Sequence, residues 1–206
     1  PPLYSSAASD VYKRQPVTGH AIDDSALLRE VVAYQFTTSM AEEVRPGPVL
    51  LAHDVDKRIL VLSDAGDGDT LADTLARSGD SDRGDLLRML GSSLGKMHAG
   101  TASREEDYDA LLHRQLRRHP EYTKHQALRD DSLQRSILIG ADILDHAGLT
   151  PPEDVLALAR TATASLSSGR DRAFTPFDLS PDNIIVGQKL TFLDYEWAGF
   201  RNVGFD

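Results

Sequence analysis

The chain has 206 residues, enough for one domain or two small lobes, and its 40% hydrophobic and 26% charged residues exclude a disordered or collagen-like chain. It contains no cysteine, which excludes disulfides, thiolate metal sites and thiol catalysis and fits a reducing compartment. A net charge of −10 disfavours nucleic acid and anionic membranes as partners and favours cationic small molecules. The sequence has no long apolar run and no signal-peptide core, which disfavours a membrane-spanning protein and predicts a soluble cytoplasmic one.

The first fifteen residues, PPLYSSAASDVYKRQ, show no sustained hydrophobic period and do not lead into the segment that follows. They resemble a translated sequencing adapter joined to a partial gene more than they resemble the start of a domain. We therefore expect residues 1–15 to be a non-native segment that contributes no element to the fold. Lys13 lies within it.

Residues 16–66 are predicted to form a partial N-terminal lobe. Residues 23–25 offer N-cap oxygens, and apolar side chains recur after them on one side of a helix of about four turns that carries Glu30. Two apolar runs, 49–52 and 59–62, flank a turn-rich stretch and predict a β-hairpin.

Residues 67–206 are predicted to form a mostly helical lobe. Asp69 or Thr70 can cap a first helix, and the apolar stripes at 86–97 and 137–144 and the helix start at Pro151 and Pro152 predict three more. After Gly169, the runs NIIV and LTFLD predict a short hairpin around a tight turn at 187–189. The expected fold class is α+β.

Three polar residues stand out at the C-terminal end, in FTPFDLSPDN and FLDYEWA. The predicted hairpin can fold Asp194 back toward Asn183, and carboxylate and amide oxygens suit a hard cation such as Mg²⁺ when a nucleotide supplies further ligands. Asp178, five residues before Asn183, is not needed for the metal and is free to accept a proton. Phosphoryl transfer to a hydroxyl requires this division of labour.

The pattern D-x-x-x-x-N followed by a strand ending in F-L-D resembles the protein-kinase-like small-molecule phosphotransferases, the aminoglycoside phosphotransferase and choline kinase group. The resemblance covers residues 17–206 through the order of elements. It implies a two-lobe protein-kinase-like fold and transfer of a phosphoryl group from ATP or GTP, with Mg²⁺, to a hydroxyl of a small molecule.

The resemblance also implies roles for single residues. Asp178 is the expected catalytic base, and Asn183 and Asp194 are the expected magnesium ligands. Glu30 is the expected helix glutamate that pairs with a phosphate-binding lysine. Lys13 lies 17 residues before Glu30, a separation that the family permits, but it belongs to the segment expected to be non-native.

Two further stretches match the family. Four residues fall where the interlobe hinge of the family offers backbone groups to the adenine: Leu62, Ser63, Asp64 and Ala65. The stretch LGKMH, residues 94–98, resembles the motif on the long helix under the active site. There the resemblance implies that His98 supports the fold and does no chemistry.

The sequence departs from the family in three places. Pro176 and Phe177 stand where the family has His-Gly before the catalytic aspartate, so the histidine that braces this loop is absent, and the rigidity of Pro176 is an alternative brace. A glycine-rich phosphate loop is expected before the first helix, and family members continue beyond Asp206. We therefore expect a fragment truncated at both ends, and the alternative function is a non-catalytic kinase-like module that binds nucleotide weakly or not at all.

Overall fold

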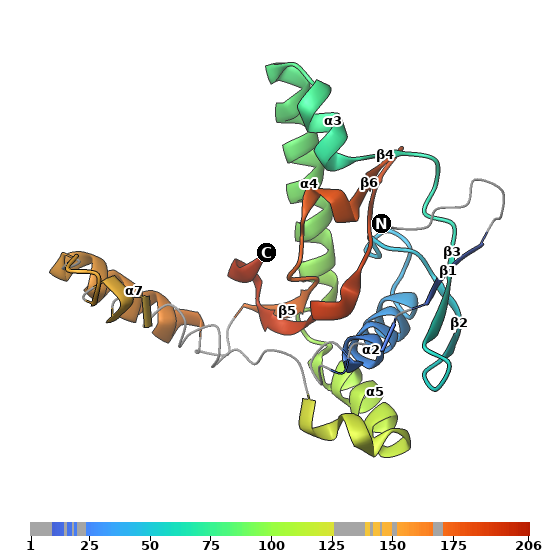
Figure 1. Cartoon of the computed structure of the whole chain (residues 1–206). Helices are drawn as coiled ribbons and strands as arrows, with labels where there is room; N and C mark the ends of the chain where they lie inside the picture. The colour runs from blue at the N-terminus through green and yellow to red at the C-terminus, as the bar shows by residue number, and fades with distance from the viewer. Residues whose placement is uncertain are drawn as a thin grey trace.

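The computed structural model describes residues 10–14, 16–17, 19, 24–125, 139–140, 142–144, 146–149, 152–166 and 171–206. The described parts are built from helices and small antiparallel sheets (Figure 1). The first part of the predicted stripe at 137–144 and the predicted helix start at Pro151 lie outside the described residues.

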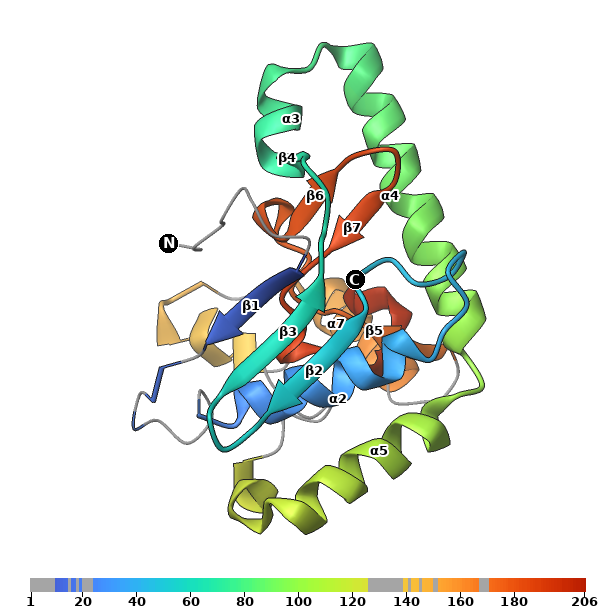
Figure 2. The ribbon, with the colours of Figure 1, turned by 90° about the vertical axis from the view of Figure 1, so that its right-hand side faces the viewer.

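The first sheet has three antiparallel strands in the order β1-β3-β2, namely β1 (Asp10–Arg14), β2 (Leu50–Asp54) and β3 (Ile59–Ser63). Figure 2 shows them side by side. The predicted hairpin is confirmed as β2 and β3. In contrast, the expectation that residues 1–15 contribute nothing to the fold is wrong for residues 10–14, which pair with β3 and place Lys13 opposite Leu60.

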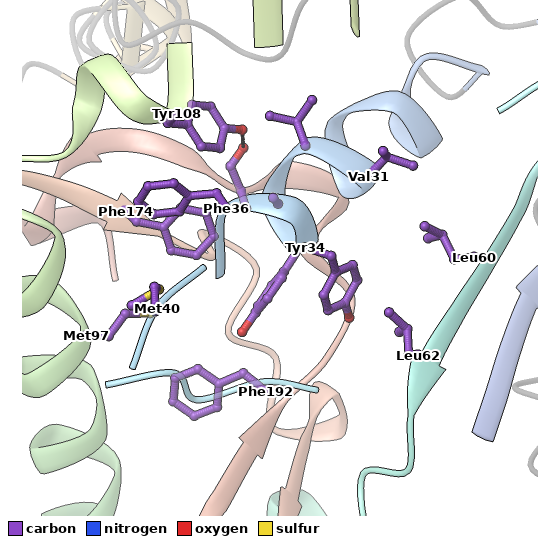
Figure 3. Packing of buried hydrophobic residues seen from close by; sticks show 14 of the residues in the cluster. Val31, Tyr34, Phe36, Met40, Leu60, Leu62, Met97, Tyr108, Phe174 and Phe192 are labelled. Atoms are coloured by element: carbon purple, nitrogen blue, oxygen red, sulfur yellow. Dashed lines mark hydrogen bonds between the residues drawn. The ribbon is translucent and has the colours of Figure 1, made fainter. Parts of the chain in front are cut away.

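Helix α2 (Ala26–Thr38) packs between this sheet and the rest of the molecule, because its apolar side chains cover more than one face. Val31 points toward the sheet side with Leu60, while Phe36 lies among aromatic rings from other elements (Figure 3). The core of the molecule is therefore centred on α2. Ser25 stands at its N-cap position, but its side chain makes no capping hydrogen bond there.

The helical part begins with α3 (Leu71–Arg77), whose N-cap residue Thr70 accepts a hydrogen bond from the Asp73 amide, as the capping signal predicts. The helices α4 (Asp80–Thr101), α5 (Glu105–Arg118) and α7 (Glu153–Leu166) follow, with the 3-10 turn η1 (Pro120–His125) after α5. Among the described residues, none of the helices combines the length and the apolar character that crossing a bilayer requires.

The C-terminal part contains the predicted hairpin, β6 (Ile184–Val186) and β7 (Leu190–Phe192), joined at its edge by β4 (Asp69–Thr70). A separate pair, β5 (Arg172–Thr175) and β8 (Gly199–Asn202), brackets the whole hairpin. The 3-10 turns η2 (Pro181–Asn183), η3 (Tyr195–Trp197) and η4 (Val203–Phe205) fill the connections. This pairing brings the loop after β5 close to the end of the chain.

Candidate active site

A partly buried ion cluster joins three elements that are far apart in the sequence. Lys13 Nζ of β1 lies 3.2 Å from Glu30 Oε1 of α2 and 2.5 Å from Asp194 Oδ1, which follows β7. The Glu30 side chain is 1% exposed, whereas those of Lys13 and Asp194 are each 35% exposed. Glu30 thus forms the closed end of the cluster, and the ammonium group stays within reach of a ligand.

The pKa values in this cluster follow from burial and from the surrounding carboxylates. Burial raises the pKa of Glu30 to about 7, with Asp194 adding to the rise and Lys13 opposing it. Burial by itself would lower the pKa of Lys13, but Glu30 and Asp194 outweigh it and the pKa is raised. Lys13 therefore stays cationic at neutral pH, which suits an anion such as phosphate.

A further carboxylate stands beside the cluster on η3. Burial, and then the charge of Asp194, raise the pKa of Glu196, with Lys13 and Arg29 opposing them. The Arg29 side chain donates from Nε to the backbone oxygen of Glu196 at 2.8 Å and lies 5.0 Å from the centre of the Trp197 ring. These contacts anchor η3 to α2, so the turn that follows Asp194 is fixed from the helix that carries Glu30.

The hairpin brings Asn183 and Asp194 to its open end, as the sequence predicts. The amide of Leu193 donates to the backbone oxygen of Asn183 at 2.8 Å, which places Asn183 across from the residue just before Asp194. Asp194 has a φ of +62°, in the left-handed region, so the chain turns sharply there into η3. The described residues hold no group of three or more His, Cys, Asp or Glu that suits a metal, and a site at this hairpin end would combine an amide with a carboxylate.

Asp178 lies in the loop after β5. Its Oδ1 accepts a hydrogen bond of 3.3 Å from the Ser180 amide. The residue before it, Phe177, has a φ of +69°, and its amide donates to Asp206 Oδ1 at 3.0 Å. The second oxygen of Asp206 lies 2.8 Å from His98 Nε2 of α4. His98 therefore supports the loop through Asp206, a structural part like the one that the resemblance implies for it.

The predicted hinge residues lie at the exit of β3. Ser63 still belongs to the sheet, since its amide donates to the Val49 oxygen and its hydroxyl accepts from the Val49 amide, both at 2.9 Å. Asp64 accepts from the Gly66 amide at 2.9 Å and starts the connection toward β4. Leu62, Ser63, Asp64 and Ala65 thus occupy the passage from the first sheet to the helical part, and contact with adenine stays a prediction.

Sequence reasoning missed two parts of the site. The partner of Glu30 was left open because Lys13 lies in a short segment without a clear period, and its strand is defined only by pairing with β3. No local signal in the sequence connects Asp206 to His98, which is 108 positions away. The Lys13 to Glu30 spacing was the one available indication, and the structure pairs these residues.

No protein-family profile and no curated protein matches this sequence. Among solved structures, the chain is similar to an aminoglycoside phosphotransferase, APH(2″)-IIa, in its ternary complex with streptomycin and ATP. The match has a TM-score of 0.53 at 14% sequence identity, and it covers 96% of this chain and 62% of that protein. This similarity confirms the predicted α+β, protein-kinase-like fold.

Proposed function

We propose that this chain carries the nucleotide-binding and catalytic centre of a phosphotransferase that uses ATP and Mg²⁺ to phosphorylate a hydroxyl group of a small molecule. The observation that carries the proposal is the position of Lys13 Nζ between Glu30 and Asp194. A cation held between a buried carboxylate and a more exposed one is a phosphate site that needs little rearrangement. Similarity to a fold that has been seen with ATP supports it.

The residues present fit a magnesium ion by their chemistry. Asn183 and Asp194 offer only oxygen ligands, the type that Mg²⁺ prefers, and phosphate oxygens and water would complete the coordination. When bound, the ion would neutralise charge on the transferring phosphoryl group. Asp178 is separate from this pair and would orient the acceptor hydroxyl and take its proton.

Charge favours a cationic acceptor. Asp194 and Glu196 lie on the same turn beside one lysine, and the whole chain carries a net charge of −10. A hydroxyl compound that bears an amine or a quaternary ammonium group would be attracted to this surface. The proposed acceptor class is therefore the amino-sugars and amino-alcohols.

The second candidate is a non-catalytic kinase-like module that binds nucleotide weakly or not at all. The observation that favours it is the sequence before Asp178, where Pro176 and Phe177 replace the His-Gly pair expected from the resemblance. The chain spans 62% of the length of the similar phosphotransferase.

Transfer of labelled γ-phosphate from ATP to a panel of amino-sugars and amino-alcohols distinguishes the candidates. We expect Asp178→Asn to reduce transfer by about 10³-fold without weakening ATP binding, because it removes the base only. Asp194→Asn should weaken the magnesium-dependent part of ATP binding. The exposed neighbour Asp182→Asn is the matched control and should change neither.

The possible outcomes separate clearly. Equal transfer by the wild type and the Asp178→Asn variant would contradict the assigned base. Magnesium-dependent ATP binding without transfer to any acceptor would favour the second candidate. A folded chain that binds no ATP would contradict the first candidate and would also favour the second.

A further inference from the structure

The backbone of Phe177, just before Asp178, is held in a conformation that the Phe177 side chain opposes. Among the described residues, Arg58, Asp171, Phe177 and Asp194 have a positive φ without being glycine, and Phe177 is the one aromatic residue of the four. A bulky side chain in the left-handed region costs free energy through contacts with its own backbone. Such a conformation persists only where the surroundings enforce it.

Three groups from a single segment, residues 201–206, surround Phe177. The Asp206 carboxylate accepts its amide, and the Arg201 guanidinium lies 4.9 Å from the centre of its ring. The Phe205 ring meets it edge to face with centroids 6.3 Å apart. Both the main chain and the side chain of Phe177 are thus held by β8 and the residues that follow it.

The groups that hold Phe177 are themselves fixed. The Asp206 side chain is 1% exposed and bound at its other oxygen by His98 of α4. Arg201 is 3% exposed and donates to the Thr175 hydroxyl, which in turn donates to the Gly199 oxygen. The segment therefore connects the long helix α4, the end of β5 and the loop before Asp178.

We propose that Phe177 is a positioning residue: its ring and amide, clamped by Arg201, Phe205 and Asp206, fix the direction in which the chain leaves β5 and so the place of Asp178. The inference rests on the proposed function, since Asp178 matters only as the base. Pro176 has no amide hydrogen, so Phe177 offers the first backbone donor after Thr175. A glycine would adopt this φ without strain but would leave the loop free, whereas the clamped phenylalanine makes it rigid.

Amide exchange of Phe177, followed by NMR on the complete 206-residue chain, tests the clamp without any assay of activity. Asp206→Ala removes both hydrogen bonds and should speed exchange of the Phe177 amide about tenfold relative to that of Leu60, a reference in β3. Asp206→Asn keeps an oxygen for the Phe177 amide and an amide donor for His98. In this variant the Phe177 amide should exchange at the wild-type rate.

A second pair of variants changes Phe177 itself and tests the clamp even if Asp206→Ala does not fold. Phe177→Ala keeps the strained φ but loses the ring contacts, so exchange of the amide at position 177 should rise about tenfold. Phe177→Gly loses the same contacts without keeping the strain, so its exchange should rise less than that of the alanine variant. Unchanged exchange at position 177 in Phe177→Ala would overturn the proposal.

Kinetics separate positioning from a merely structural part. In the phosphate-transfer assay, Phe177→Ala should lower kcat about tenfold with the KM for ATP unchanged, because the proposed nucleotide contacts lie on the Lys13 side. An equal loss in ATP binding would mean general loosening of the fold and would contradict the assignment. If the chain transfers no phosphate at all, the proposed function fails, and the exchange results still decide whether the clamp exists.

Discussion

Helices α2 and α7 have nearly equal lengths, 13 and 14 residues, and opposite surroundings. In α2 almost every residue is buried, including the charged Arg29 and Glu30. In α7 two apolar side chains lie in the open, Val155 at 50% and Leu158 at 69% exposure. Figure 1 shows α7 extending away from the body of the molecule, while α2 lies at its centre.

The difference shows what a hydrophobic period does and does not determine. Both helices are predicted by their apolar repeats, but a repeat does not say how many faces other elements will cover. In α2 the covering elements are β2, α5 and η3, and η3 directly follows Asp194. The packing of η3 on α2 thus contributes both to the burial of this helix and to the position of Asp194 in the ion cluster.

The largest expected effect on stability is at Phe36, in the last turn of α2. Its ring is fully buried, with the rings of Tyr108, Phe174 and Phe200 at 5.4 to 5.6 Å. We expect Phe36→Ala to lower the free energy of unfolding by about 3–5 kcal/mol through lost burial and a cavity. Urea unfolding measures it, and Phe36→Leu, which keeps most of the volume, should cost about 1.5 kcal/mol or less. A loss below about 1 kcal/mol for the alanine variant would mean that this core is not formed.

The next effect is the pH dependence that Glu30 gives to stability. Its folded pKa of about 7 lies above its ordinary value of 4.5, so the folded state binds the proton more tightly than the unfolded state. The resulting stabilisation is fully present below pH 4.5 and is lost as the pH rises to about 7. This shift corresponds to about 3 kcal/mol at most.

Urea unfolding at pH 5 and pH 8 in metal-free buffer measures this difference. From pH 5 to pH 8, the free energy of unfolding of Glu30→Gln should rise by about 2 kcal/mol relative to that of the wild type, because glutamine cannot lose a proton. The exposed Glu43→Gln is the control and should follow the wild-type profile. If the Glu30→Gln and wild-type curves stay parallel, the carboxyl is not buried beside Asp194 as described.

The local parts of the fold could be predicted from the sequence. Turn residues and short-range alternation predict the two hairpins, and the second hairpin brings Asn183 and Asp194 together. The hydroxyl of Thr70 predicts the helix cap. Each of these signals lies within a few residues of the structure that it specifies. The resemblance indicated the kinase-like fold, which the similarity to a solved phosphotransferase structure confirms.

The parts that could not be predicted depend on contacts between distant residues. Strand β1 has five residues, too few for a period, and becomes a strand by pairing with β3. The partners of Phe177 lie 24 to 29 positions further on, in β8 and at the end of the described chain. Sequence patterns describe the faces of an element, and these contacts are decided by which faces meet.

The smallest expected effect is at Leu158, on the open side of α7. Leu158→Ser should change the free energy of unfolding by no more than about 0.5 kcal/mol beyond the lower helix propensity of serine, because a side chain that is 69% exposed loses little burial. The half-buried Leu156→Ser in the same helix has the same propensity change and should cost about 1 kcal/mol more. Urea unfolding compares the two variants directly. A loss of about 2 kcal/mol or more at Leu158 would show that this face is covered in solution, and α7 would then resemble α2.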